Sequence, residues 1–138
     1  MLERLLLSAI IILVGTGGWV FYNRLSVKRL ARSASTDPLL AQVRAGIPAI
    51  VYFTTPNCQP CRTLQRPALD QLEAELGANI QVIQVDSSEQ PDVADRWGVF
   101  SAPTTFVLDS QLRPRQVNRG VASTETLKKQ LKQLESIA

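Results

Sequence analysis

The 138-residue sequence predicts an α/β domain, a mixed four-stranded sheet flanked by helices, preceded by a single transmembrane helix. Three observations predict this architecture. An uncharged apolar run, residues 5–23, stands near the N-terminus. Beyond it, short runs rich in β-branched and aromatic residues alternate with segments whose apolar residues recur every three or four positions. The resulting order is α, β, α, β, α, β, β, α, in a chain with no room for a sizeable insertion.

The apolar run 5–23 has the length of a membrane-spanning helix. Its residues would rise roughly 28 Å as a helix, close to the hydrocarbon thickness of a bilayer. Trp19 and Tyr22 lie at its C-terminal end, where aromatic belts form. A cleaved signal peptide is the alternative, but this run exceeds the usual apolar core of roughly 7–15 residues and no small-x-small cleavage site follows it. We therefore predict a retained anchor over residues 1–23, in contact with membrane lipid through 5–23.

A basic juxtamembrane linker is predicted over residues 24–36. Residues 1–35 carry a net charge of +4, whereas the remaining residues carry −1. The positive-inside rule therefore places residues 24–138 in the cytoplasm. The linker either binds anionic lipid headgroups or acts only as a solvated topology signal. The near-neutral domain lacks the basic stripe of a nucleic-acid-binding protein, so nucleic acid is not expected as a partner.

Small residues interrupt the apolar run at Gly15-Thr16-Gly17-Gly18. Two interpretations stay open. Such residues let a partner helix approach closely, which would provide a site for a membrane-protein partner, but glycine is also common in membrane helices.

The remaining residues, 37–138, are predicted to form the folded domain. Its expected elements, in order, are a helix that starts at Thr36–Pro38 and stops before Gly46, a strand at 49–54, a helix at 59–76, a strand at 79–86, a short helix at 91–97, a strand at 104–109, an edge strand at 116–119 and a final helix that Ser123 caps.

Apolar residues and helix breakers justify these assignments. The strand 49–54 is an unbroken run of β-forming side chains. Pro67 removes a backbone donor and should kink the helix 59–76, which Gly77 ends. The face of that helix is formed by Leu64, Ala68, Leu69, Leu72 and Leu76, and the core face of the final helix by Leu127, Leu131 and Leu134.

Both cysteines of the chain, Cys58 and Cys61, fall where the strand 49–54 gives way to a helix. The free N–H groups and positive dipole end of that helix favour a thiolate at Cys58 and lower its pKa. Cys61, one turn further on, is close enough to resolve a mixed disulfide formed at Cys58. The pattern predicts a redox dithiol. A metal site is not expected, because the chain has no histidine and a four-thiolate site would need two chains.

Four features together resemble the thioredoxin family, over roughly residues 46–137. They are Cys58-Gln59-Pro60-Cys61 after the first core strand, Asp86 ending the second strand, the Ala102-Pro103-Thr104 step and Gly120 after the last strand. The resemblance implies a cis-proline at Pro103 lying beside Cys58. It also implies that the backbone of Ala102 pairs with an extended segment of a protein substrate. Pro60 would shape the turn between the cysteines, and Asn57 would rim the docking surface.

This sequence departs from the family near the chemistry. Tyr52 stands where a buried acid is usual, and Val82 stands where a lysine often accompanies that acid. Asn57 replaces a tryptophan, Gln59 replaces a glycine, and Pro67 comes one residue later than usual. In the family the acid takes a proton from the resolving cysteine. Its absence affects the expected rate and redox poise, while the dithiol itself is intact.

The functional expectation is a membrane-tethered thiol–disulfide oxidoreductase acting on protein dithiols through Cys58 and Cys61. No cofactor is required, because the dithiol carries both electrons. The compartment in which the domain lies sets the direction of disulfide exchange. The positive-inside rule favours the cytoplasm, whereas many membrane-tethered members of the family face the extracytoplasmic side. The alternative function is a non-catalytic accessory subunit of a membrane protein complex, which the missing acid, the missing lysine and the glycine-containing span favour.

Overall fold

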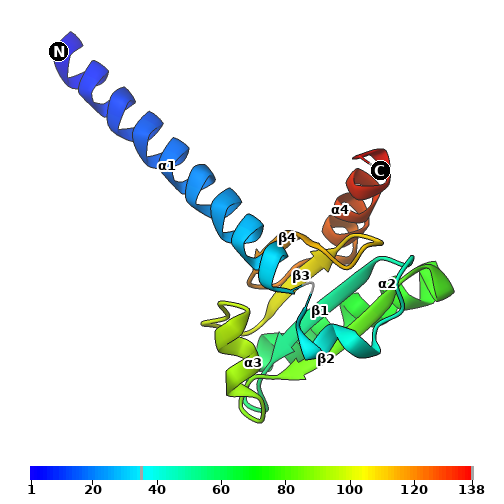
Figure 1. Cartoon of the computed structure of the whole chain (residues 1–138). Coiled ribbons are helices and arrows are strands. Elements are labelled where there is room, and N and C mark those ends of the chain that lie inside the picture. The colour runs from blue at the N-terminus through cyan, green and yellow to red at the C-terminus, as the bar shows by residue number, and fades with distance from the viewer. Residues whose placement is uncertain (35, 138) are drawn as a thin grey trace.

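The computed structural model describes residues 1–34 and 36–137. It shows a four-stranded mixed sheet between helices, preceded by one long helix (Figure 1), as the sequence predicts. Ser35 of the predicted linker and Ala138 of the predicted domain lie outside the described residues.

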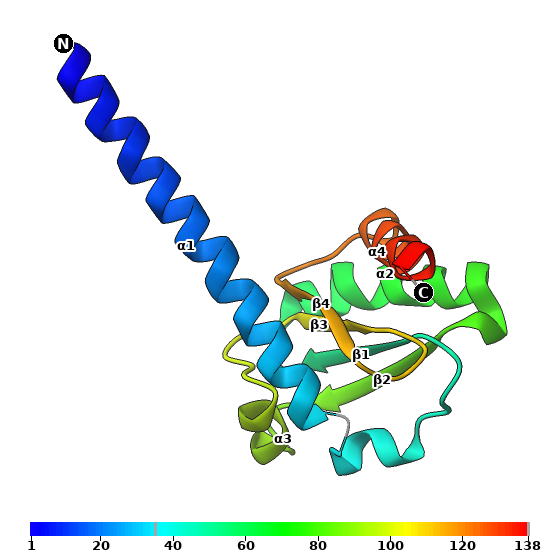
Figure 2. The same ribbon diagram turned by 45° about the horizontal axis from the view of Figure 1, so that its top comes forward.

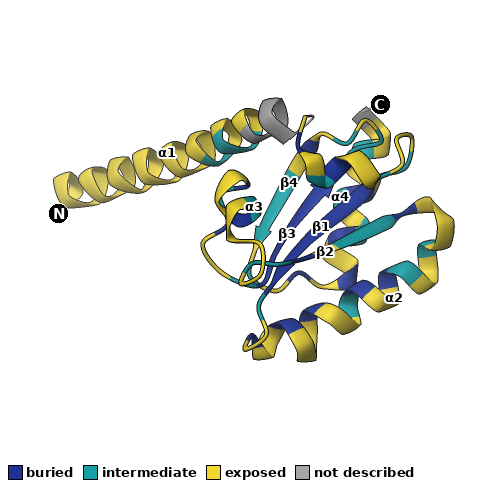
Figure 3. Ribbon diagram, turned by 60° about the horizontal axis from the view of Figure 1, so that its bottom comes forward, coloured by how far each residue is buried: buried dark blue, intermediate teal, exposed yellow. Residues whose placement is uncertain are grey.

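The sheet has the strand order β2-β1-β3-β4. Strand β1 (Ala49–Thr54) runs parallel to β2 (Gln81–Asp86) and antiparallel to β3 (Thr104–Leu108), and β4 (Pro114–Arg119) pairs antiparallel with β3 at the edge. Both central strands are buried along their whole length (Figure 3). An unbroken apolar run such as β1 suits this position, because a central strand covered on both faces has no solvated side.

Two hydrophobic clusters cover the two faces of the sheet. Val51 and Phe53 of β1 point to the face covered by the 3-10 helix η1 (Pro38–Gln42) and by α3 (Pro91–Arg96). Ile50 and Tyr52 point to the opposite face, which is covered by α2 (Arg66–Leu76) and α4 (Thr124–Ile137). The alternation follows from the two-residue period of a strand. The leucines predicted to form the core face of the final helix, α4, do face this second cluster.

Several element boundaries differ from the sequence prediction. The first helix is only the short η1, because Val43 already adopts an extended conformation. Strand β2 begins at Gln81 rather than at residue 79, since a further 3-10 turn, η3 (Gly77–Asn79), carries the chain out of α2. Strand β4 is longer than predicted and begins at Pro114, whereas β3 ends at Leu108.

Helix α1 (Leu2–Ala34) is continuous through the region predicted as a linker, as far as Ala34. The part Leu2–Arg29 is long and apolar enough to cross a membrane, with a mean hydropathy of 2.0 over an 18-residue window, although a signal sequence meets the same criterion. Its large apolar side chains from Leu2 to Leu25 are exposed. The C-terminal half of α1 lies beside β4 (Figure 2), and Asn23, Ser26 and Val27 are partly buried there.

Asp37 joins η1 to α3 through a buried carboxylate. Its side chain is 5% exposed and accepts hydrogen bonds from the Leu39 backbone N–H at 2.9 Å and from Trp97 Nε1 at 3.1 Å. Arg96 adds an ion pair at 3.2 Å between Nε and Oδ2. Burial raises the pKa of Asp37, but the hydrogen bonds from Arg96, Leu39 and Trp97 outweigh it, so the pKa lies below its ordinary value.

We expect a chain of residues 36–138 to remain soluble and to unfold cooperatively, because none of residues 2–29 of α1, whose side chains the structure describes, belongs to either hydrophobic cluster. Near-UV and far-UV circular dichroism should report one coincident transition. A product that keeps its far-UV signal but has lost its near-UV signal would show that α1 is needed for packing, and would contradict this prediction.

Asp37→Ala should lower the free energy of unfolding by about 2–3 kcal/mol, because it leaves the buried Trp97 Nε1–H and the partly buried Leu39 N–H without an acceptor. Since the folded pKa is depressed, the contribution of the carboxylate is complete above the pKa of an unfolded aspartate, near 3.9, and is lost as the pH falls through the folded value. Urea unfolding at pH 7 and pH 3 measures both effects. The control is Asp70→Ala, which removes an exposed ion pair with Arg66 and should cost less than about 1 kcal/mol; equal losses in the two variants would contradict the role of Asp37.

Candidate active site

The two cysteines lie where β1 passes into a helix, as the sequence predicts. After β1 the chain turns, and the Cys58 N–H donates to the carbonyl of Thr55 at 3.1 Å. Helical hydrogen bonding then begins, with the Arg62 N–H 3.4 Å from the carbonyl of Cys58. Cys61 opens η2 (Cys61–Gln65), a single π-helical turn that continues into α2.

Cys58 and Cys61 form a disulfide with an S–S distance of 2.00 Å and a Cα–Cα distance of 5.3 Å. The two residues differ in access to solvent, because Cys58 is 8% exposed whereas Cys61 is fully buried. The Cys61 backbone N–H lies 3.2 Å from Cys58 Sγ. A donor placed at this distance stabilises negative charge on the outer sulfur once the pair is reduced.

Pro103 is brought to the cysteines by the pairing of β1 with β3. Phe53 is aligned with Thr104, so the residues before β3 lie beside the residues that follow β1. The Ala102–Pro103 peptide bond is cis, as the resemblance implied. Gly120 adopts a φ of 105°, which favours glycine, and its N–H donates to the Pro103 carbonyl at 2.8 Å.

The backbone of Ala102 remains available for pairing. Strand β3 begins two residues later, and no backbone hydrogen bond joins Ala102 to another described residue. Cys58 is surrounded by exposed residues on its own loop, namely Pro56, Asn57, Gln59 and Pro60. The predicted site residues are thus brought together at one end of the sheet.

Sequence reasoning missed Phe100, which is 89% exposed three residues before Pro103. It lines a cleft of about 220 Å³ together with Thr55 of the cysteine loop, Val99 and Ala102. Its neighbour Val99 is buried, so the two apolar residues cannot be distinguished by hydrophobicity alone. One feature of the sequence could have identified Phe100 as exposed. It follows the glycine that ends α3, and it belongs to no periodic apolar face.

Tyr52 occupies the place of the missing acid beneath Cys61. Its side chain is 2% exposed, and its Oη donates to the Cys61 carbonyl at 3.3 Å. Burial raises the pKa of the Tyr52 phenol, so the side chain is neutral near pH 7. Tyr52 therefore holds the backbone of Cys61 but is a poor acceptor for the proton of its thiol.

The π-helical turn η2 stands directly before the displaced proline. In it the Arg66 N–H bonds to the Cys61 carbonyl, five residues back. Pro67 has no N–H to offer the carbonyl four residues earlier, and its ring would clash with that group in a regular α-helix. The wider turn avoids the clash. The kink predicted at Pro67 stays a prediction, and the structure instead places a π-turn, a feature frequent at functional sites, directly before this proline.

Gln65 was also missed, although it is fully buried in this turn. Its amide exchanges two hydrogen bonds with the backbone of Ala122, donating at 3.1 Å and accepting at 2.8 Å. It therefore fastens the cysteine helix to the segment between Gly120 and α4. A helical plot at 100° per residue places Gln65 at the centre of the apolar face and Leu64 at its margin. Leu64, predicted on that face, is 57% exposed.

Comparisons with known proteins agree with this geometry. The thioredoxin family model matches residues 33–133. Thioredoxin 1 of Synechococcus elongatus is 32% identical over 94 residues, covering 67% of this chain and 87% of that protein. Thioredoxin 1 of a Nostoc species is 32% identical over 106 residues, covering 73% and 98%.

The fold also resembles solved structures. Chloroplastic thioredoxin z superposes with a TM-score of 0.61 at 22% identity, covering 70% of this chain and 86% of that one. Thioredoxin-2 of the malaria parasite gives a TM-score of 0.59 at 24% identity, covering 63% and 82%. With the family match over most of the domain and an adjacent Cys58–Cys61 disulfide, this chain belongs to the thioredoxin family and is a thioredoxin-type thiol–disulfide oxidoreductase.

Proposed function

We propose that this protein exchanges disulfides with protein substrates while tethered to a membrane by α1, with Cys58 as the nucleophile and Cys61 as the resolving cysteine. The observation that carries the assignment of roles is the asymmetry of the pair. Cys58 is the more exposed residue and receives the Cys61 N–H on its sulfur, whereas Cys61 is fully buried.

Exchange proceeds in two displacements that transfer two electrons. In the reducing direction, the Cys58 thiolate attacks one sulfur of a substrate disulfide, and the other substrate sulfur leaves as a thiolate that takes up a proton. Cys61 then loses its proton and attacks Cys58 Sγ. The Cys58–Cys61 disulfide forms, and the substrate leaves with both sulfurs reduced. The oxidising direction is the reverse of these steps.

The docking surface that we propose combines the cysteine loop with the segment Phe100–Pro103. The free backbone of Ala102, held by cis Pro103, pairs with an extended substrate segment in the manner of an added strand. Asn57 and Pro60, both exposed, border the segment on the cysteine loop. Phe100 offers an apolar contact on the other side, beside the cleft at Ala102.

The tether rests on the exposed apolar surface of α1 and on the absence of charged residues from 5 to 23. By the positive-inside rule, the basic residues after the span favour a cytoplasmic domain, which would act as a reductase. In an extracytoplasmic position the domain would relay oxidising or reducing equivalents. Alkaline carbonate extraction of membranes, combined with protease protection of a C-terminal tag, tests both points. A protein shortened by removal of its N-terminus would instead identify a signal peptide.

Limited alkylation of the reduced protein should modify Cys58 before Cys61. The N–H at its sulfur and its place before the helix favour the thiolate of Cys58 at a pH where an ordinary thiol is protonated. Mass spectrometry of peptides after iodoacetamide treatment between pH 5 and 7 measures the order. First modification at Cys61 would reverse the roles, and a reduced, folded protein with two inert thiols would favour an accessory subunit without redox activity.

Phe100→Ser should lower kcat/KM for a protein disulfide by about tenfold, because the variant loses the apolar surface that a substrate chain would cover. Turnover of a small aromatic disulfide, which needs no extended docking, should be unchanged. Leu64→Ser is the matched control, since Leu64 is also exposed but lies outside the cleft. Equal losses for protein and small disulfides would exclude Phe100 from substrate docking.

Tyr52→Asp combined with Val82→Lys should speed decay of the mixed disulfide by about tenfold or more between pH 6 and 8, because a carboxylate can accept the Cys61 proton. Single-turnover kinetics measure the decay. Tyr52→Phe, which removes the hydroxyl and its hydrogen bond to the Cys61 carbonyl but adds no base, should not decay faster than the wild type. Tyr52→Asp alone should lower the free energy of unfolding, because it buries a carboxyl without a partner. Equal decay in the wild type and the double variant would show that another group already takes the proton.

A further inference from the structure

A cavity of about 890 Å³ lies between the C-terminal half of α1 and the edge of the sheet. Its lining residues come from α1 on one side and, on the other, from the turn between β3 and β4 and the first residues of β4. Figure 2 shows this part of α1 beside β4. Four of its lining residues are cationic: Arg24, Lys28, Arg113 and Arg115. This cavity is far from the cysteines in the sheet, because β1 and β3 are antiparallel and the β3–β4 turn follows the opposite end of β3.

The residues of α1 that line the cavity change from apolar to cationic along the helix. Trp19 and Val20, which line the cavity, belong to the uncharged run, whereas Arg24 and Lys28 come one and two turns after Val20. Residues four apart lie on one helical face, and four residues rise about 6 Å. The cavity therefore passes from an apolar, aromatic end to a cationic end in the direction that leads out of the proposed membrane span.

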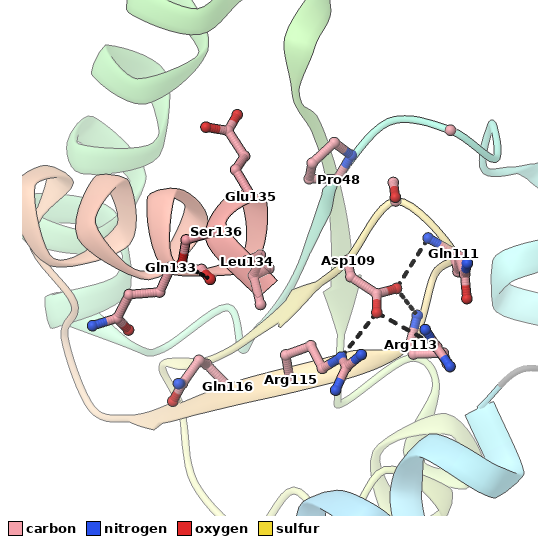
Figure 4. A pocket seen from close by; sticks show the side chains of 12 residues that line it. Pro48, Asp109, Gln111, Arg113, Arg115, Gln116, Gln133, Leu134, Glu135 and Ser136 are labelled. Atoms are coloured by element: carbon pink, nitrogen blue, oxygen red, sulfur yellow. Dashed lines mark hydrogen bonds and ion pairs between the residues drawn. The ribbon is translucent and has the colours of Figure 1, made fainter. Parts of the chain in front are cut away.

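The cationic groups retain unused hydrogen-bond donors. Arg113 and Arg115 approach Asp109 through Nε, at 3.3 Å and 2.8 Å, and remain 46% and 42% exposed (Figure 4). Their terminal guanidinium nitrogens make no hydrogen bond to another described residue. Arg24 and Lys28 form no ion pair within residues 1–34 and 36–137. Asp109, which does not line this cavity, thus pairs with two of the four cations, and the other two have no ion pair among the described residues.

We propose that this cavity binds the phosphate-bearing headgroup of an anionic phospholipid and so holds the domain against the membrane surface. Guanidinium groups suit phosphate oxygens because they donate in pairs. Trp19 at the apolar end suits the boundary between headgroups and acyl chains. A free phosphate ion would meet the same cations but would leave this apolar end uncovered, so a lipid is the better match. The proposal rests on the membrane tether proposed above.

The test uses the full chain in nanodiscs of mixed phosphatidylglycerol and phosphatidylcholine. Native mass spectrometry then counts the lipids that stay bound after the nanodisc is stripped away. We expect one phosphatidylglycerol to be retained in preference to phosphatidylcholine. Both Arg24→Gln/Lys28→Gln and Arg113→Gln/Arg115→Gln should lower this preference about tenfold. The first pair does not touch Asp109, so it remains informative if the second pair disturbs the β3–β4 turn.

The matched control is Lys129→Gln/Lys132→Gln, which removes two exposed charges from α4 and should leave the preference unchanged. Inorganic phosphate added at millimolar concentration should not displace the lipid. Equal retention of the two lipids, an equal loss in the control pair, or displacement by inorganic phosphate would each overturn the site while leaving the tether intact. A chain released from membranes by carbonate would overturn the tether, and this site with it.

Discussion

The antiparallel pairing of β1 with β3 holds the two halves of the active site together. One half, the cysteine loop, follows the end of β1, and the other, the Ala102–Pro103 step, precedes β3. The alignment of Phe53 with Thr104 sets their relative position. A slip of one residue would also exchange the faces of Phe53 and its neighbours between the two hydrophobic clusters. The packing that stabilises the sheet therefore also fixes the geometry of the redox pair.

A second set of contacts, all hydrogen bonds, holds the backbone around the buried Cys61. The carbonyl of Cys61 accepts hydrogen bonds from Tyr52 and from the N–H of Arg66, and Gln65 ties the same turn to Ala122. These bonds position Cys61 without supplying a base, because a buried phenol keeps its proton near neutral pH. The site thus combines an outer sulfur at Cys58, which we propose attacks the substrate, with a fully buried sulfur at Cys61 whose backbone is fixed by hydrogen bonds and whose neighbour Tyr52 is not a carboxylate.

The sequence was sufficient for features that depend on local pattern. Strand β1 and the placement of Cys58 were predictable, because an unbroken apolar run and a helical repeat meet at the cysteines. Features that depend on residues distant in the sequence could not be predicted in this way. Gln65 looks like a solvated residue until Ala122, 57 positions away, is placed beside it. The polarity of residues 24–36 predicts a linker but not its helical conformation, which extends to Ala34 and suits arginine, lysine and leucine because they are good helix formers. The cavity between α1 and β4 likewise requires the tertiary arrangement.

Trapping of mixed disulfides tests the central claim, that a membrane-held Cys58 attacks protein disulfides, most directly. The full chain carrying Cys61→Ser is expressed in native membranes, quenched with acid and separated without reductant. We expect adducts with other proteins that dithiothreitol releases, that remain in the membrane fraction, and that Cys58→Ser abolishes. Adducts formed by the Cys58→Ser chain instead, or none in either variant, would contradict the account and favour a non-catalytic accessory subunit.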